Sequence, residues 1–465
     1  MKCLWLHTNK CFWITGMLFI LATTGCKKLV QVDEPDDSLT AGTVFSNDSL
    51  AQAAVAGLYI KIMSSTKFLL NGGMSLFPSL SADELQRTIA MNSEDQFYIN
   101  AINPRSLTVN TNFWKAAYAY IYQCNICIEG LSKSTGVTAA VKNRLSGEVK
   151  FVRALCYYYL VNLYGDVPLV LGTNAEVNAL LPRTSVNQVY KQMETDLVAA
   201  ADALTDAKEN TTPTTYAAKA LLARVYLHLS DNTKAEEMAS AVINAGQFSL
   251  QSDLNAVFKS NSKETIFQWA PVMDKINAAE GFMFIQPNPG IRPTYVLTTN
   301  LKNAFEGDDL RMQHWVGMVT SGTQTYYYPY KYKIYQSING NAPTEYNVVL
   351  RLAEQYLIRA EALARQGKIA QAVADINTIR TRAQLPDIST SIGNDACLQA
   401  IEQERRIELF AEWGHRWFDL KRTNRADAVL SAVKGSNWHP HDRLYPIPFT
   451  ELELDPNLKQ NPGYD

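Results

Sequence analysis

The only histidine cluster in the 465-residue sequence, His439-Pro-His441-Asp442, combines residue types that bind metal ions. Pro440 places this cluster on a loop. A protein metal site needs several converging ligands, and the sequence nominates no others beside this loop. We therefore expect neither a bound metal nor a cofactor.

Cys124-Asn-Ile-Cys127 has the spacing of a redox or zinc-binding pair. No second pair follows it, and it lies inside a helical pattern of apolar residues. Because free cysteines pack as small apolar residues, we expect Cys124, Cys127, Cys156 and Cys397 to lie in the core.

A dense run of acidic and basic residues at 402–416 could be taken for paired carboxylates of a glycoside hydrolase. Its opposite charges are spaced for pairing along one helix face: Glu402 with Arg406, Arg405 with Glu408, and Glu412 with Arg416. Arginines lower the pKa of neighbouring carboxylates, which makes them poor general acids. The sequence also lacks a Gly-x-Ser-x-Gly elbow, a His-Glu-x-x-His helix and a phosphate-binding glycine loop. We expect a packing role for this run and no enzyme activity.

Paired amphipathic helices are the elements that must position these residues. Apolar residues from Leu352 to Ala364 recur with helical spacing, Gly367 ends that helix, and a second periodic run covers 369–379. Two helices joined by a tight glycine turn, in a unit of about 34 residues, are typical of a tetratricopeptide repeat. The same pattern is present at 217–229 and 235–243, and further helices are expected at 49–63, 113–131, 142–164 and 186–204. The sequence predicts a mainly α fold with a lobe of stacked helix pairs.

Two segments, 64–112 and 246–346, lack this periodicity. They are rich in Pro, Gly, Asn and aromatic residues, which favours loops and short strands, and Trp269 is expected in a buried strand. Long irregular segments in a helical protein usually carry function. We expect them to form an irregular, partly β lobe that packs against the helical lobe.

The first residues of the chain have the layout of a secretory signal. Basic residues precede an apolar run from Cys11 to Ala22, which is too short to cross a bilayer. The run leads into Gly25-Cys26, as in a bacterial lipoprotein signal whose cysteine is lipidated; the alternative is an ordinary cleaved signal with a chance cysteine. We expect residues 1–25 to be removed and Cys26 to anchor the mature chain. The formal net charge of −2 gives no indication of nucleic-acid binding.

Several runs resemble the SusD/RagB family of outer-membrane nutrient-binding lipoproteins from Bacteroidetes-type bacteria. They occur in the order of that family: 147–169, 301–311, 350–365, 404–422 and 445–464. The resemblance implies four tetratricopeptide units in a SusD-like α-α superhelix. It also implies a lipid-anchored, surface-exposed protein that delivers oligosaccharides to a SusC-like TonB-dependent transporter. On this basis residues 26–245 form an N-terminal SusD-like region and residues 246–465 a C-terminal SusD/RagB region.

Sugar binding requires exposed aromatic faces with polar side chains beside them. Phe97, Tyr98 and Asn100 lie in the first irregular segment, close to where the family usually places part of its aromatic platform. They are therefore the first candidates. Tyr295 and Trp315 in the second segment are further candidates.

The tyrosine-rich run at 325–335 is not expected to form the platform. If the run is a strand, its tyrosines divide between two faces and one face is buried. Part of the run also matches a strand-like Lys-Tyr pair of the family, Lys331-Tyr332.

The function expected from these features is non-catalytic glycan binding at the cell surface, as the partner subunit of an outer-membrane transporter. Two alternatives stay open. One is a RagB-like surface lipoprotein that binds peptides, and the other is a periplasmic helical-repeat adaptor that binds only proteins.

Overall fold

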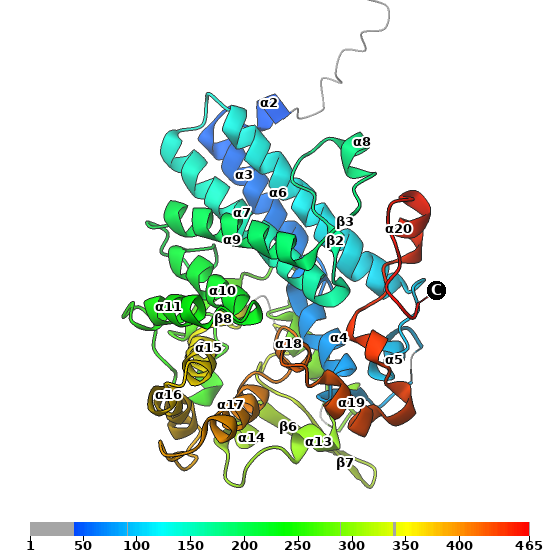
Figure 1. The fold of residues 1–465 in the computed structure, drawn as a ribbon, viewed down its shortest axis with the longest axis vertical. Coiled ribbons are helices and arrows are strands. Elements are labelled where there is room, and N and C mark those ends of the chain that lie inside the picture. Colours follow the sequence, from blue (N-terminus) through cyan, green and yellow to red (C-terminus); the bar gives the residue numbers. More distant parts are fainter. Residues whose placement is uncertain (1–40, 91, 289, 338–340, 465) are drawn as a thin grey trace, which may run out of the picture. The chain divides into compact units, whose positions relative to one another are not determined.

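The computed structural model describes residues 41–90, 92–288, 290–337 and 341–464 (Figure 1). The signal segment and the predicted lipidation site Cys26 lie outside the described residues. The chain divides into a short unit, residues 1–43, and a large unit, residues 44–465, and the description below concerns the large unit.

Long helices account for the predicted helical lobe. Their bounds are α3 (Asp48–Met63), α6 (Ala116–Lys133), α7 (Ala139–Tyr164), α9 (Val186–Ala203), α10 (Thr215–His228), α11 (Asn232–Ile243), α15 (Leu352–Arg365), α16 (Ile369–Arg382) and α17 (Asn394–Glu408). Side chains at the boundaries fix where helices begin. The Asn47 side chain accepts from the Leu50 N–H at 3.0 Å, and the Thr214 hydroxyl accepts from the Ala217 N–H at 3.1 Å.

Neighbouring helices pack in series through this lobe. Figure 1 shows α3, α6 and α7 alongside one another, and contacts continue from α7 to α9, α10, α11 and α15. The predicted pairs are confirmed as α10 with α11 and α15 with α16. Gly367 between α15 and α16 has a φ of 77°, a conformation that glycine adopts without strain.

The remaining α-helices of the described residues are short: α2 (Ala41–Val44), α4 (Met74–Ser81), α5 (Asn92–Tyr98), α8 (Ala175–Asn178), α12 (Ala279–Phe284), α13 (Thr299–Lys302), α14 (Leu310–Trp315), α18 (His415–Arg422), α19 (Ala426–Lys434) and α20 (Phe449–Leu454). Two of them, α4 and α5, lie in the segment 64–112, where we had expected loops. Apolar side chains on α4 explain the difference, because every residue of that helix is buried. No helix among the described residues is long and apolar enough for a membrane span.

Within the described ranges, the strands form four separate antiparallel pairs. They are β1 (Leu85–Arg87) with β5 (Tyr295–Leu297), β2 (Val167–Pro168) with β3 (Arg183–Thr184), β4 (Thr265–Trp269) with β8 (Asn347–Arg351), and β6 (Val316–Ser321) with β7 (Gln324–Pro329). Because β1 belongs to the first irregular segment and β5 to the second, their pairing joins the two segments. All of β4 is buried, which confirms the prediction for Trp269.

The largest core cluster draws residues from both lobes, including much of α7, and two smaller clusters lie around α15, α16 and α17. Tyr157, Tyr158 and Tyr159, consecutive on that helix, are each at most 1% exposed. The four cysteines at 124, 127, 156 and 397 are buried and unbridged, as predicted. Burial raises the pKa of the Cys127 thiol to about 12, so this thiol is protonated at neutral pH.

The acidic and basic run around α17 is buried, but its predicted pairing along one helix face is wrong. Glu404, Glu408 and Glu412 pair instead with arginines from distant segments, and we call the group that they form the arginine cluster. Its members are Glu264, Asp309, Arg311, Arg351, Arg382, Glu404, Glu408 and Glu412. The packing role is confirmed, because Arg351 alone donates to three carboxylates: Glu264 just before β4, Glu408 at the end of α17, and Glu412 in the turn that follows.

Candidate functional site

Phe97, the first candidate for a ligand platform, lies in the core. Its side chain is 0% exposed, and its ring packs 4.7 Å from Phe77 and 5.5 Å from Tyr445, measured between centroids. Our expectation that Phe97 presents a free aromatic face is therefore wrong. Helix α5 turns Phe97 inward, and sequence spacing alone does not show which side of so short a helix faces the core.

Asn100, Tyr295 and Trp315 are also buried, with exposures of 3%, 4% and 0%. The Asn100 amide donates to the Ser81 carbonyl at 3.1 Å, and the Trp315 Nε1 donates to the Leu254 carbonyl at 2.9 Å. All three side chains are buried, so the structure does not support them as an exposed platform.

The structure does bring Tyr295 next to helix α5, in the first irregular segment (residues 64–112). The Tyr295 hydroxyl donates to Glu94 Oε2 at 2.7 Å, and Lys67 Nζ lies 2.5 Å from Glu94 Oε1. These contacts hold α5 against the β1–β5 pair. Trp315 takes no part, because it packs against Phe258 with ring centroids 5.8 Å apart.

Tyr98 is the one candidate ring that stays half-buried. Lys434 Nζ lies 4.1 Å from the centroid of that ring, so a cation occupies part of its surface. The next residue, Ile99, is 39% exposed and begins a segment that borders a cavity.

That cavity, which we call the C-terminal cavity, has a volume of about 470 Å³. It is lined by Ile99, Asn100, Ala101, Ile102, Asn103, Pro104, Ser436, Asn437, His439, His441, Asp442, Gly463 and Tyr464. Amides, imidazoles, a carboxylate and a tyrosine therefore surround a space in the size range of small-ligand sites. Asn100 and the histidine cluster, on its two walls, are each noticeable in the sequence, but no local pattern indicates that they meet.

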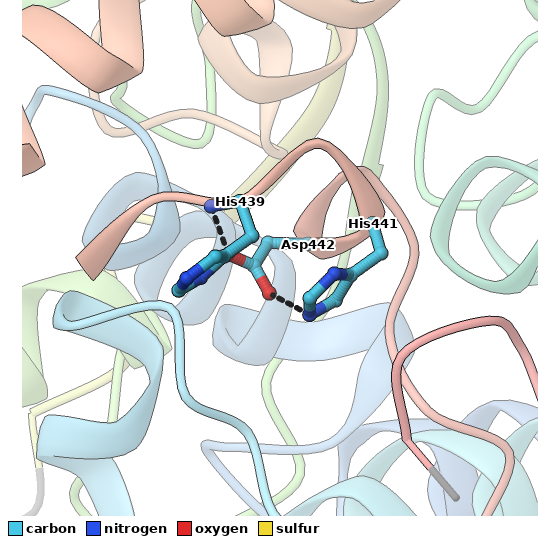
Figure 2. A group of neighbouring side chains, drawn as sticks. All are labelled: His439, His441 and Asp442. Carbon is cyan, nitrogen blue, oxygen red and sulfur yellow. Dashed lines mark hydrogen bonds and ion pairs between the residues drawn. The ribbon is translucent and has the colours of Figure 1, made fainter. Parts of the chain in front are cut away.

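The histidine cluster forms one side of this cavity (Figure 2). His439 Nδ1 is 3.6 Å from Asp442 Oδ2, and His441 Nε2 is 3.3 Å from Asp442 Oδ1. The two imidazole rings are nearly parallel, at 14°, with centroids 5.3 Å apart. The Asp442 side chain is 4% exposed, whereas that of His439 is 59% exposed. Burial raises the pKa of the Asp442 carboxyl.

A second cavity, of about 480 Å³, lies beside α17 and α19. Its charged lining side chains already neutralise one another. Arg406 and Arg416 lie 2.7 and 2.8 Å from Asp83, and Arg425 lies 2.8 Å from Glu402. A ligand here would have to displace formed ion pairs.

The β6–β7 hairpin carries half-buried tyrosines that we had not favoured as a platform. Tyr326 and Tyr328 lie on one face of β7, and Tyr328 lies over Gly317, where a Cβ would come 2.3 Å from its ring. The expectation that strand alternation divides the tyrosines between two faces is confirmed for β7, where Tyr327 packs against the core. The same alternation could have indicated that Tyr326 and Tyr328 lie on the face of β7 that points away from the core.

Comparison with known proteins identifies the class to which this fold and these segments belong. A model of the SusD family matches residues 316–464, and a model described as starch-binding associating with outer membrane matches residues 48–227. The chain is 28% identical over 516 residues to a SusD-like protein of Formosa agariphila, covering 98% of this chain and 100% of that protein.

Solved structures share the same architecture. A SusD superfamily protein from Bacteroides vulgatus has a TM-score of 0.77 and 25% identity, covering 90% of this chain and 100% of that chain. A laminarin-binding SusD-like protein has a TM-score of 0.76 and 24% identity, with the same coverage. The chain belongs to the SusD/RagB family, a starch- and glycan-binding family associated with the outer membrane.

Proposed function

We propose that this protein binds a glycan without cleaving it, on the outside of the outer membrane, and passes it to a SusC-like TonB-dependent transporter. The observation that carries the proposal is the pair of family matches at 48–227 and 316–464, which together cover most of both lobes. Glycan binding by the laminarin-binding neighbour supports this choice over peptide binding.

The C-terminal cavity is the ligand site that the described residues support best. It is concave, and it presents side-chain amides such as Asn103 and Asn437 together with the rings of His441 and Tyr464. Sugars are recognised by this combination of ring faces and hydrogen-bonding groups. The cavity beside α17 is less suitable because its charges are already paired, as described above.

Titration with oligosaccharides of laminarin and starch tests the function, and variants test the site. Asn437 is exposed at the rim of the cavity, so Asn437→Ala should leave folding intact and weaken binding about 2- to 10-fold, the scale of one hydrogen bond. Tyr326→Ala on the β6–β7 hairpin is the matched control and should leave affinity unchanged. Loss of binding in the control alone would move the site to the hairpin, and binding of peptides but no glycan would favour the RagB-like alternative.

Lipid anchoring at Cys26 is the second part of the proposal. The sequence Gly25-Cys26 follows an apolar run, and among the described helices none is fit to span a membrane. Cys26→Ala should therefore release the protein into the soluble fraction of cells that lack the transporter. Unchanged membrane fractionation would contradict the anchor, and protection from protease added to intact cells would favour the periplasmic adaptor.

The transporter is the third part. A tethered binding protein has no channel of its own, so nutrient uptake requires docking to a protein that has one, through a large interface. Purification from native membranes in mild detergent should recover a TonB-dependent barrel with this chain. Recovery of the chain alone, while other outer-membrane complexes stay assembled, would count against the partnership.

A further inference from the structure

We propose that His439, His441 and Asp442 bind one divalent transition-metal ion of the zinc type, with its remaining coordination positions facing the C-terminal cavity. The sequence alone had led us to expect no metal here, because it nominates no further ligands beside this loop. The inference concerns the metal alone and does not depend on glycan binding.

The three side chains converge in the structure. One donor atom from each lies within 4.8 Å of the other two. Zinc–ligand bonds of about 2.0–2.2 Å place tetrahedral ligand atoms about 3.3 Å apart. The two imidazole–carboxylate distances, 3.3 and 3.6 Å, are already close to that spacing. These two distances involve different oxygens of Asp442, so the exposed His439 ring must turn toward Oδ1 before the three donor atoms can reach one ion.

The charge of Asp442 is the second reason. Among the residues that the structure describes, no lysine or arginine forms an ion pair with this buried carboxylate, and its ion-pair partners are the two histidines. A buried carboxylate without a cation is costly. A bound divalent ion would supply the missing charge, and neutral imidazoles would complete its ligand set.

The backbone fixes the orientation of the ligands, as expected for a metal site. The His439 N–H donates to Asp442 Oδ2 at 2.7 Å and leaves Oδ1 facing His441, as Figure 2 shows. Pro440 begins the short 3-10 turn, Pro440–Arg443, that places Asp442 back toward His439. Gly463 lies over the His441 ring, where a Cβ would come 2.4 Å from the ring carbons, so its lack of a side chain allows the ring to stay in place.

The donor set selects the class of ion. Two imidazoles and one carboxylate suit zinc, cobalt, nickel and copper, whereas calcium and magnesium prefer a shell of oxygen ligands. Three protein ligands leave at least one position of a tetrahedral ion for water or for an oxygen of a ligand. Because these side chains line the C-terminal cavity, that open position faces a space of about 470 Å³.

Metal titration of the protein, purified without a histidine tag and stripped with EDTA, tests the proposal. We expect one Zn²⁺ per chain by calorimetry and a visible absorption spectrum of four-coordinate Co²⁺. His439→Ala and Asp442→Asn should each weaken binding at least about tenfold, since they remove a ligand. His314→Gln is the matched control, because His314 lies outside the cluster and pairs with Asn255.

Absence of Zn²⁺ and Co²⁺ binding at millimolar concentration would overturn the proposal, as would binding that all three variants retain. Should Asp442→Asn fail to fold, His439→Ala decides the question, because that side chain is 59% exposed. No glycan is present in these titrations, so their failure would leave the proposed glycan binding untouched. Conversely, a protein that binds zinc and no glycan would retain the metal site and lose the proposed function.

Discussion

The arginine cluster and the histidine cluster show two ways in which this protein holds buried carboxylates. Glu408 is 0% exposed and accepts from Arg311 at 3.1 Å and Arg351 at 2.6 Å, with Arg382 as a third partner. Asp442 is 4% exposed, and within the described part of the chain its ion-pair partners are two imidazoles, with one backbone N–H donating to it. A buried carboxylate is therefore surrounded by several cationic groups in the arginine cluster and by none that is permanently charged in the histidine cluster.

The difference indicates which region is structural and which is available for chemistry. Burial by itself would raise the pKa of Glu408, but the guanidinium groups of Arg382, Arg351 and Arg311 outweigh it and hold that pKa well below its ordinary value. Such a carboxylate stays charged and has no remaining capacity for a ligand. For Asp442 burial dominates and raises the pKa, and its neighbours are residues that bind protons or metal ions.

The largest expected effect is in the arginine cluster. Arg351→Met should cost about 3–5 kcal/mol of unfolding free energy, because it leaves Glu264, Glu408 and Glu412 buried with fewer cations. Urea denaturation at pH 7 measures this loss. Arg425→Met is the control: its side chain is 46% exposed in its pair with Glu402, and we expect at most about 1 kcal/mol. Equal effects in the two variants would mean that burial does not set the strength of these pairs.

The arginine cluster also shows what could be predicted from the sequence. Helical periodicity predicted α10, α11, α15 and α16, because apolar spacing is a local property. The charge run predicted local pairing of Glu412 with Arg416, but Glu412 pairs with Arg351 from β8 and Arg416 with Asp83 from the first insertion. Ion pairs between residues so far apart in the sequence depend on tertiary packing. The spacing of charges within one helix gives no information about that packing.

The binding residues were harder to predict for a related reason. Phe97 and Tyr295 are aromatic residues in irregular segments, as expected for an exposed platform. Only the packing of the folded chain shows that both rings face inward. Asn100 and the histidine cluster were each noticed in the sequence, yet they are more than 300 residues apart and the fold alone makes them neighbours. Recognition of the family succeeded because it rests on many short runs in order rather than on the direction of one side chain.

Glu84 is a buried carboxylate that forms no ion pair with any described residue, so it resembles Asp442 more than Glu408. It is 1% exposed, accepts from the Ser79 hydroxyl at 2.7 Å, and its Oε1 has no hydrogen-bond partner. Burial raises its pKa from 4.5 to about 7. Between these two values the folded state holds a proton that the unfolded state has lost, so the contribution of Glu84 to stability is fully present below pH 4.5 and is lost as the pH rises through 7.

Glu84→Gln should remove this penalty. At pH 8 the variant should be more stable than the natural protein by about 1–3 kcal/mol, and at pH 4 the two should be equal. Urea denaturation across this pH range measures the difference. A variant that is less stable at both pH values would show that the carboxylate is compensated within the fold, and Glu84 would then belong with the arginine cluster.

The smallest expected effect is in the histidine cluster without metal. His439→Ala in EDTA should change the unfolding free energy by less than about 0.5 kcal/mol, because its side chain is 59% exposed and little packing is lost. Removing one partner of Asp442 would thus cost far less than removing one partner of Glu408. Added Zn²⁺ should then stabilise the natural protein by mass action and the variant much less. A loss above about 1 kcal/mol in EDTA would assign the ring a packing role instead, and would make the two clusters alike.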